Sequence, residues 1–193
     1  MMTWIPNLLT ALRLVLLLPI MGLLSRGGGA GMHWLAFGLF LLAAATDLLD
    51  GWAARRLGCA SNIGTFFDPL ADKIFVNVLL IFLACYHPAW IPLWVVLLLL
   101  AREFAVQGFR SMTPCLGVVI STGQVSKLKF VFQMIAAGTA LAGMGWNAAA
   151  PLLRPATWLA LALAVVTAFW SMLSLFRDNA DLWGRSPLEM ERR

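Results

Sequence analysis

The chain has 193 residues, of which 61% are hydrophobic and only 12% are charged, and its mean hydropathy is +0.85. Soluble domains carry about 25% charged residues, so this composition excludes an ordinary soluble domain and indicates an integral membrane protein. A net charge of +5 would suggest nucleic acid as the partner of a soluble protein. In a membrane chain, basic loops and anionic phosphate ligands explain this charge, and we expect no nucleic-acid partner.

Apolar segments recur along the chain, each near the length that a helix needs to cross a bilayer. They cover approximately residues 7–25, 32–54, 66–86, 89–110, 126–146 and 151–176. This pattern predicts an all-α fold, a polytopic bundle of six transmembrane helices surrounded by membrane lipids. We expect one transmembrane domain over residues 1–176, followed by a cytoplasmic tail over 177–193 that contains both acidic and basic residues.

The distribution of charge predicts the orientation of the bundle. Six spans place both termini on one side of the membrane, and all 14 Lys and Arg residues except Arg26 and Arg154 fall on that side. The positive-inside rule makes that side cytoplasmic, with the chain in the cell inner membrane. All nine acidic residues lie there too, whereas the two histidines, His33 and His87, lie opposite. We therefore expect an active site at the cytoplasmic face that functions without histidine.

Four carboxylates interrupt the apolar background: Asp47, Asp50, Asp68 and Asp72. The first two are three residues apart and the last two are four apart, so each pair shares one helix face. Salt bridges to Arg55, Arg56 and Lys73 are one explanation. The other is a hard divalent cation such as Mg²⁺, or a pair of them, because paired carboxylates near a bilayer need compensation. Pro69 either begins the third helix or kinks it.

Eight residues in this stretch form a longer motif, D-x-x-D-G-x-x-A-R, then eight residues, then G-x-x-x-D-x-x-x-D. They are Asp47, Asp50, Gly51, Ala54, Arg55, Gly64, Asp68 and Asp72. With this motif the chain resembles the CDP-alcohol phosphatidyltransferases. The resemblance implies a reaction in which an alcohol attacks the β-phosphorus of CDP-diacylglycerol and expels CMP.

The resemblance also implies roles for individual residues. The four aspartates would ligate two divalent ions, Mg²⁺ or Mn²⁺, and Asp72 would be the catalytic base, in agreement with the absence of histidine on that side. The residues that match CDP-diacylglycerol contacts of the family are Asn7, Thr10, Gly51, Ala54, Arg55, Ser61 and Gly64. Asn7 and Thr10 belong to an Asn-x-x-Thr-x-x-Arg element ending at Arg13. Taken alone, this element favours a helix start with an Asn cap and a snorkelling arginine.

Four further basic residues flank the fourth connection on the same side: Arg102, Arg110, Lys127 and Lys129. Positive-inside bias is one explanation, and an acceptor that carries a phosphate is the other. The segments AREFAVQGFR and SKLKFVFQM resemble the branch of the family that uses sn-glycerol 3-phosphate, the bacterial phosphatidylglycerophosphate synthases. That resemblance implies acceptor-phosphate contacts by these four residues, and a homodimer.

Two alternatives stay open from the sequence. Within the same chemistry, the acceptor is inositol phosphate, or phosphatidylglycerol as in a cardiolipin synthase. In a different class, the chain is a transporter whose acidic cluster binds a cation. A transporter would more naturally place charges and broken helices near mid-bilayer, whereas these charges gather at one face.

Overall fold

The computed structural model describes the backbone of residues 4–27, 29–57, 62–116 and 124–180. It describes side chains for residues 11–27, 29–46, 70–114 and 127–180. These parts of the chain contain no strand, so the described fold is all-helical, as the apolar segments predict.

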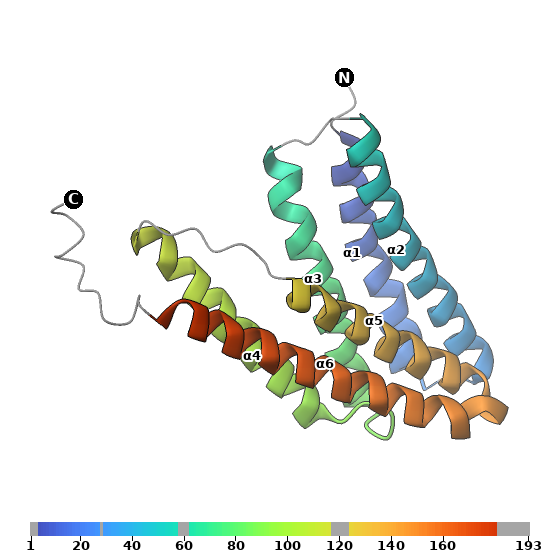
Figure 1. Cartoon of the computed structure of the whole chain (residues 1–193). Coiled ribbons are helices and arrows are strands. Elements are labelled where there is room, and N and C mark those ends of the chain that lie inside the picture. The colour runs from blue at the N-terminus through green and yellow to red at the C-terminus, as the bar shows by residue number, and fades with distance from the viewer. Residues whose placement is uncertain (1–3, 28, 58–61, 117–123, 181–193) are drawn as a thin grey trace, which may run out of the picture.

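The described residues form a succession of helices (Figure 1). They are α1 (Trp4–Ser25), α2 (Ala30–Leu57), α3 (Asn62–Tyr86), α4 (Leu93–Met112), α5 (Gln124–Gly145) and α6 (Ala150–Asp178). Two 3₁₀ turns, η1 (Thr113–Leu116) and η2 (Asn147–Ala149), follow α4 and α5. Each helix corresponds to one apolar segment, so the number and the type of elements are confirmed within the described residues.

Local sequence explains several helix ends. Gly27, between α1 and α2, has a φ of 58°, a left-handed conformation that glycine adopts without steric cost. Pro92 precedes α4 in an extended conformation, and since proline has no amide proton, none is left without a partner at this helix start. Since α3 begins at Asn62, Pro69 lies inside this helix and does not start it. Of the two positions that the sequence allowed for Pro69, the first residue of the third helix is therefore wrong.

The helices pack in two groups (Figure 1). α1 contacts both α2 and α3, α5 lies against α2 and α3, and α6 packs along α5 and against α4. The seam between α5 and α6 is rich in small residues: Ala136, Ala137 and Ala140 are buried on α5, and Ala160, Ala164 and Ala168 on α6. Small side chains let two helix backbones approach closely, which is how helices associate in a membrane, where burial of apolar surface gives little driving force.

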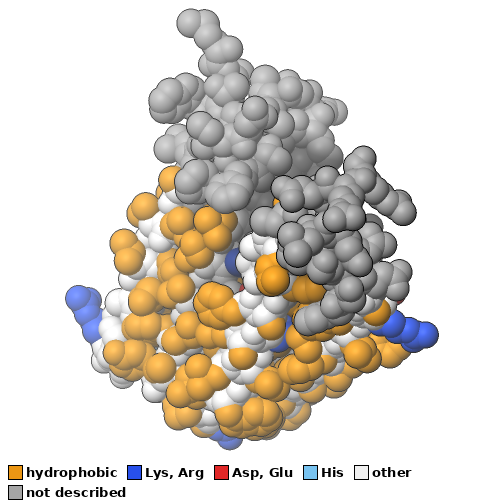
Figure 2. Space-filling model, turned by 90° about the vertical axis from the view of Figure 1, so that its left-hand side faces the viewer, with side chains coloured by type: hydrophobic (Ala, Val, Ile, Leu, Met, Phe, Trp, Pro, Cys, Tyr) orange, Lys and Arg blue, Asp and Glu red, His pale blue; other side chains and the backbone are white. Residues whose placement is uncertain are grey.

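The outer surface of the bundle is apolar. Leu152, Leu159, Val166, Trp170 and Leu173 of α6 are all exposed, and hydrophobic side chains cover much of the described surface in Figure 2. Among the described residues, two stretches are long and apolar enough to cross a membrane, Lys127–Gly145 and Asn147–Asp178. An exposed surface of this kind would cause aggregation in water but suits a lipid environment.

The connections on the side away from Asp72 are held by aromatic packing. Trp90, between α3 and α4, lies against Gly143 of α5 so closely that a Cβ there would overlap its ring. The Arg154 guanidinium lies 5.7 Å from the centre of the same ring and donates to the Ala89 carbonyl at 3.1 Å. His33 and His87 meet edge to face, with ring centres 5.4 Å apart.

Candidate active site

The predicted metal-binding residues lie on two consecutive helices. The helical backbone places Asp47 and Asp50 in α2, and Asp68 and Asp72 in α3. Of the four side chains only that of Asp72 is among the described residues. The same holds for the predicted CDP-diacylglycerol contacts: Asn7 and Thr10 lie in α1, Gly51, Ala54 and Arg55 in α2, and Gly64 in α3, whereas Ser61 falls outside the described residues. The prediction of a metal and nucleotide site therefore stays a prediction.

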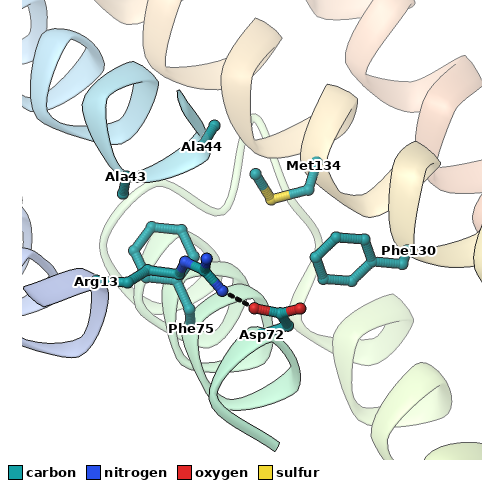
Figure 3. Close-up of a pocket in the computed structure, with 7 residues that line it drawn as sticks. All are labelled: Arg13, Ala43, Ala44, Asp72, Phe75, Phe130 and Met134. Atoms are coloured by element: carbon teal, nitrogen blue, oxygen red, sulfur yellow. Dashed lines mark ion pairs between the residues drawn. The ribbon is translucent and has the colours of Figure 1, made fainter. Parts of the chain in front are cut away.

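Asp72 forms an ion pair with Arg13 of α1 (Figure 3). The Arg13 guanidinium is 3% exposed and points across the space between α1 and α3 to the Asp72 carboxylate. The two residues share a small cavity of about 10 Å³ with Phe75, Phe130 and Met134. Because a buried guanidinium is costly without an anion, the pair fixes the first helix to the third at this point.

Asp72 also lines a much larger cavity, of about 500 Å³, between α3, α4 and α5. All four residues that the sequence predicts as acceptor-phosphate contacts line it: Arg102, Arg110, Lys127 and Lys129. The structure therefore brings these basic residues together around one space, beside the predicted catalytic carboxylate. Two of these residues come from α4 and two from α5, and the packing of the helices brings them together.

The cavity has further polar lining residues that the sequence analysis did not select: Lys73, Asn77, Glu103 and Gln133. Glu103 lies at the centre of the charges. Its Oε1 is 3.0 Å from Lys73 Nζ, its Oε2 contacts Lys129 Nζ, and Arg102 Nη1 lies 3.6 Å from Oε2. A carboxylate shared among several cations compensates their charge at this depth in an apolar bundle.

Arg102 has a structural role in addition to its place on the cavity wall. Its Nε donates to the Ala168 carbonyl at 2.8 Å, and its Nη2 donates to the Ser171 hydroxyl at 2.7 Å. Both partners are on α6, and Arg102 is only 3% exposed. The side chain therefore ties α4 to α6, whether or not a ligand occupies the cavity.

Helical spacing is the signal that would have found the missed residues. Lys73 and Asn77 are four apart on α3, and Lys129 and Gln133 are four apart on α5, so each pair shares a face. A polar face on a mostly apolar helix needs a polar counterpart, and here that counterpart is the cavity. For Glu103 the ion-pair partners, Lys73 and Lys129, come from other helices, so no spacing within α4 predicts them.

Comparison with known proteins identifies the family. Residues 3–170 match the CDP-alcohol phosphatidyltransferase family. Among curated relatives, a protein of Bacillus subtilis (strain 168) is 41% identical over 103 residues, which are 53% of this chain and 52% of that protein. A protein of Escherichia coli (strain K12) is 32% identical over 190 residues, 92% of this chain and 96% of that protein.

A third relative, from Rickettsia typhi (strain ATCC VR-144 / Wilmington), is 35% identical over 140 residues, 72% of this chain and 76% of that protein. All three relatives are named CDP-diacylglycerol–glycerol-3-phosphate 3-phosphatidyltransferase. The family expected from the aspartate motif is thus confirmed, since the match covers far more than half of the sequence. The chain belongs to the CDP-alcohol phosphatidyltransferase family.

Proposed function

We propose that this chain is the enzyme that transfers a phosphatidyl group from CDP-diacylglycerol to sn-glycerol 3-phosphate, giving phosphatidylglycerophosphate and CMP. The observation that carries the proposal is the cavity in which five basic side chains surround a space next to Asp72. A phosphate-bearing acceptor fits such a cavity, whereas an amino alcohol, whose amine is protonated at neutral pH, or a neutral polyol would gain little from a cluster of cations. The names of the relatives support the same acceptor.

In the proposed reaction, the acceptor hydroxyl oxygen forms a bond to the β-phosphorus of CDP-diacylglycerol. The bond from that phosphorus to the bridging oxygen breaks, and CMP leaves with the electron pair. The hydroxyl proton goes to the Asp72 carboxylate, which lies on the wall of the acceptor cavity. Arg13 orients this carboxylate through the ion pair at Oδ1.

The donor set suits hard divalent cations, because carboxylate oxygens are the ligands that Mg²⁺ and Mn²⁺ prefer. A carboxylate has two oxygens, so the Arg13 contact through Oδ1 is compatible with a metal contact through the other. We propose that Asp47, Asp50, Asp68 and Asp72 hold two such ions. When bound, the ions would stabilise negative charge on the pyrophosphate and on the leaving oxygen.

We place the reaction at the cytoplasmic face of the inner membrane. The proposal rests on the distribution of charge: the basic side chains of the cavity lie around one space, and in the sequence all Lys and Arg residues except Arg26 and Arg154 fall in the termini or connections of one side. Six spanning helices then put both termini in the cytoplasm, with a transferase domain over residues 1–176 and a tail over 177–193. The proposed assembly is a homodimer.

The direct test uses purified protein in detergent with CDP-diacylglycerol, Mg²⁺ or Mn²⁺, and a panel of acceptors. We expect CMP release with sn-glycerol 3-phosphate and none without divalent metal. If CMP appears only with inositol phosphate or phosphatidylglycerol, the proposed acceptor is wrong. If no acceptor yields CMP, the enzymatic proposal is wrong, and cation transport becomes the hypothesis to test.

The contacts proposed for the acceptor phosphate can be tested within the same assay. Arg110→Gln and Lys127→Gln each remove one cation from the cavity wall, and we expect the KM for glycerol 3-phosphate to rise several-fold. The KM for CDP-diacylglycerol should not change, because both residues line the acceptor cavity. Equal changes in both KM values would place these residues elsewhere in the reaction.

A further inference from the structure

Glu103 is the anionic centre of the acceptor cavity. Its side chain is 15% exposed, and its two carboxylate oxygens serve different cations. Oε1 lies 3.0 Å from Lys73 Nζ on α3, and Oε2 contacts Lys129 Nζ on α5. A single carboxylate on α4 therefore connects basic side chains of the two neighbouring helices.

The two lysines depend on this carboxylate to different degrees. The Lys129 side chain is only 7% exposed and forms its ion pair with Glu103, so removal of the carboxylate would leave a buried ammonium without compensation. The Lys73 side chain is 39% exposed and donates in addition to Gln107 Oε1 at 3.5 Å, a long and weak hydrogen bond. Without Glu103 the two ammonium groups would repel each other, and Lys73 is free to turn toward solvent.

Arg102 provides an internal comparison. Its guanidinium donates to the Ala168 carbonyl and the Ser171 hydroxyl of α6, so its position is fixed without Glu103. The distance of 3.6 Å from its Nη1 to Glu103 Oε2 is longer than a hydrogen bond. Removal of Glu103 should therefore displace Lys73 and Lys129 but leave Arg102 in position.

The cavity retains a surplus of positive charge despite Glu103. Five basic side chains line it, Lys73, Arg102, Arg110, Lys127 and Lys129, against the carboxylates of Asp72 and Glu103. A phosphate monoester at neutral pH carries a charge of about −1.5 to −2. The site can thus hold its lysines in place when it is empty and still attract such a dianion.

We infer that Glu103 is a positioning residue for the acceptor phosphate: it holds the ammonium groups of Lys73 and Lys129 on the wall of the cavity that contains Asp72. The inference rests on the proposed function for the identity of the acceptor, and it adds a residue that does not itself touch the phosphate. A preorganised pair of donors binds an anion more tightly than two mobile ones, because less side-chain entropy is lost on binding.

Glu103→Gln tests the inference, since the amide keeps the size of the side chain and removes its charge. Two quantities are measured on full-length protein in detergent: the Kd for inorganic phosphate by calorimetry, and the KM values for both substrates. We expect the phosphate Kd and the KM for glycerol 3-phosphate each to rise by about ten-fold or more, the loss of roughly one charged hydrogen bond. The KM for CDP-diacylglycerol should stay at the wild-type value.

Asp178→Asn is the matched control, because it makes the same chemical change at an exposed carboxylate that accepts from Ser174 at the end of α6. It should leave all three constants unchanged. An unchanged phosphate Kd in Glu103→Gln overturns the inference. A lower Kd also overturns it, because Glu103 would then be a competitor of the phosphate.

A second variant decides the question if Glu103→Gln does not fold. Glu103→Leu with Lys129→Met removes both members of the buried pair and leaves no uncompensated charge, an exchange that buried ion pairs often tolerate. We expect this double variant to fold and to bind phosphate more weakly than Lys129→Met alone, because Lys73 has then also lost its anchor. Equal phosphate Kd values in these two variants would refute the positioning role.

The two readouts separate this inference from the proposed function. If the wild-type protein releases no CMP with glycerol 3-phosphate but Glu103→Gln still weakens phosphate binding, the proposed acceptor fails and the role of Glu103 stands. If the wild-type protein turns over and phosphate binding is indifferent to Glu103, the proposed function stands and the inference fails.

Discussion

At the end of the bundle that contains Asp72, helices α1, α3, α4 and α5 meet through ion pairs, whereas at the other end the connections meet through aromatic rings and glycine. Asp72 pairs with Arg13, and Glu103 pairs with Lys73 and Lys129 around a cavity of about 500 Å³. At the other end Trp90 fills the space beside Gly143. One end thus keeps an open polar space, and the other closes by packing.

This difference between the two ends suggests that one end of the helices serves function and the other serves stability. Buried charges cost free energy unless they are compensated, so they persist where a ligand or a reaction needs them. Close packing of a ring against a glycine stabilises the structure without offering a binding site. Substitutions at the polar end should therefore change turnover first, and substitutions at the packed end should change stability alone.

The largest effect is expected for Asp72→Asn. The amide keeps the size of the side chain but can neither take the acceptor proton nor bind metal as a carboxylate does, so kcat should fall by about 10²-fold or more. The measurement is CMP release with both substrates saturating. Binding of CDP-diacylglycerol should be largely retained, and Asp178→Asn should behave as wild type. Turnover close to wild type would remove Asp72 from the mechanism.

Arg13→Ala should rank second, because it affects both stability and turnover. It leaves Asp72 without its ion-pair partner, and because the Asp72 side chain is itself 24% exposed, the cost should be less than the roughly 3–5 kcal/mol of a fully buried pair. We expect a lower midpoint of thermal unfolding in detergent and slower CMP release. Arg13→Lys keeps the charge and should lose less of both. If Arg13→Ala matched the wild type in both measurements, the ion pair would have no role in orienting Asp72.

Gly143→Ala tests the packed end. Its Cβ would overlap the Trp90 ring, and overpacking of this kind costs about 1–3 kcal/mol. The midpoint of thermal unfolding should fall, while the folded protein keeps the wild-type kcat. Gly108→Ala on α4 is the matched control, because a Cβ there meets nothing within 4 Å and alanine favours a helix. Equal stabilities of the two variants would contradict the packing argument.

The smallest effect concerns pH. Burial lowers the pKa of His87, in the connection between α3 and α4, below its usual value of 6.5, and nearby His33 lowers it further. The unfolded chain therefore takes up a proton on His87 at a higher pH than the folded chain does. The stability of the folded protein should therefore fall slightly as the pH drops through about 6.5. His87→Gln should reduce this dependence, as measured by thermal unfolding between about pH 7.5 and 5.5.

Much of the fold and the family follow from local features of the sequence. A membrane helix is long, apolar and self-contained in its hydrogen bonding, so its existence can be predicted from composition over a single stretch. Each of the apolar segments is a helix within the described residues, with ends that differ by a few residues from the expected ones. The motif from Asp47 to Asp72 predicts the family for a similar reason, because it is contained in one continuous stretch.

The pairing of charges illustrates what the sequence leaves open. Lys73 is a candidate partner for Asp72 by proximity, but the structure pairs Asp72 with Arg13 and Lys73 with Glu103. The physical reason is helical geometry. Adjacent residues on a helix point about 100° apart and do not face each other, so each side chain meets a different neighbouring helix.

The sequence by itself determined the class of protein, the succession of helices and the residues with chemistry to offer, since these are local properties of composition, periodicity and spacing. Only the tertiary structure decided which charges meet. Arg102, Arg110, Lys127 and Lys129 become one site with Asp72, and Glu103 becomes its centre, because α3, α4 and α5 pack side by side around one cavity. Contacts between helices depend on how their faces are turned toward one another, and no single stretch of sequence contains that information.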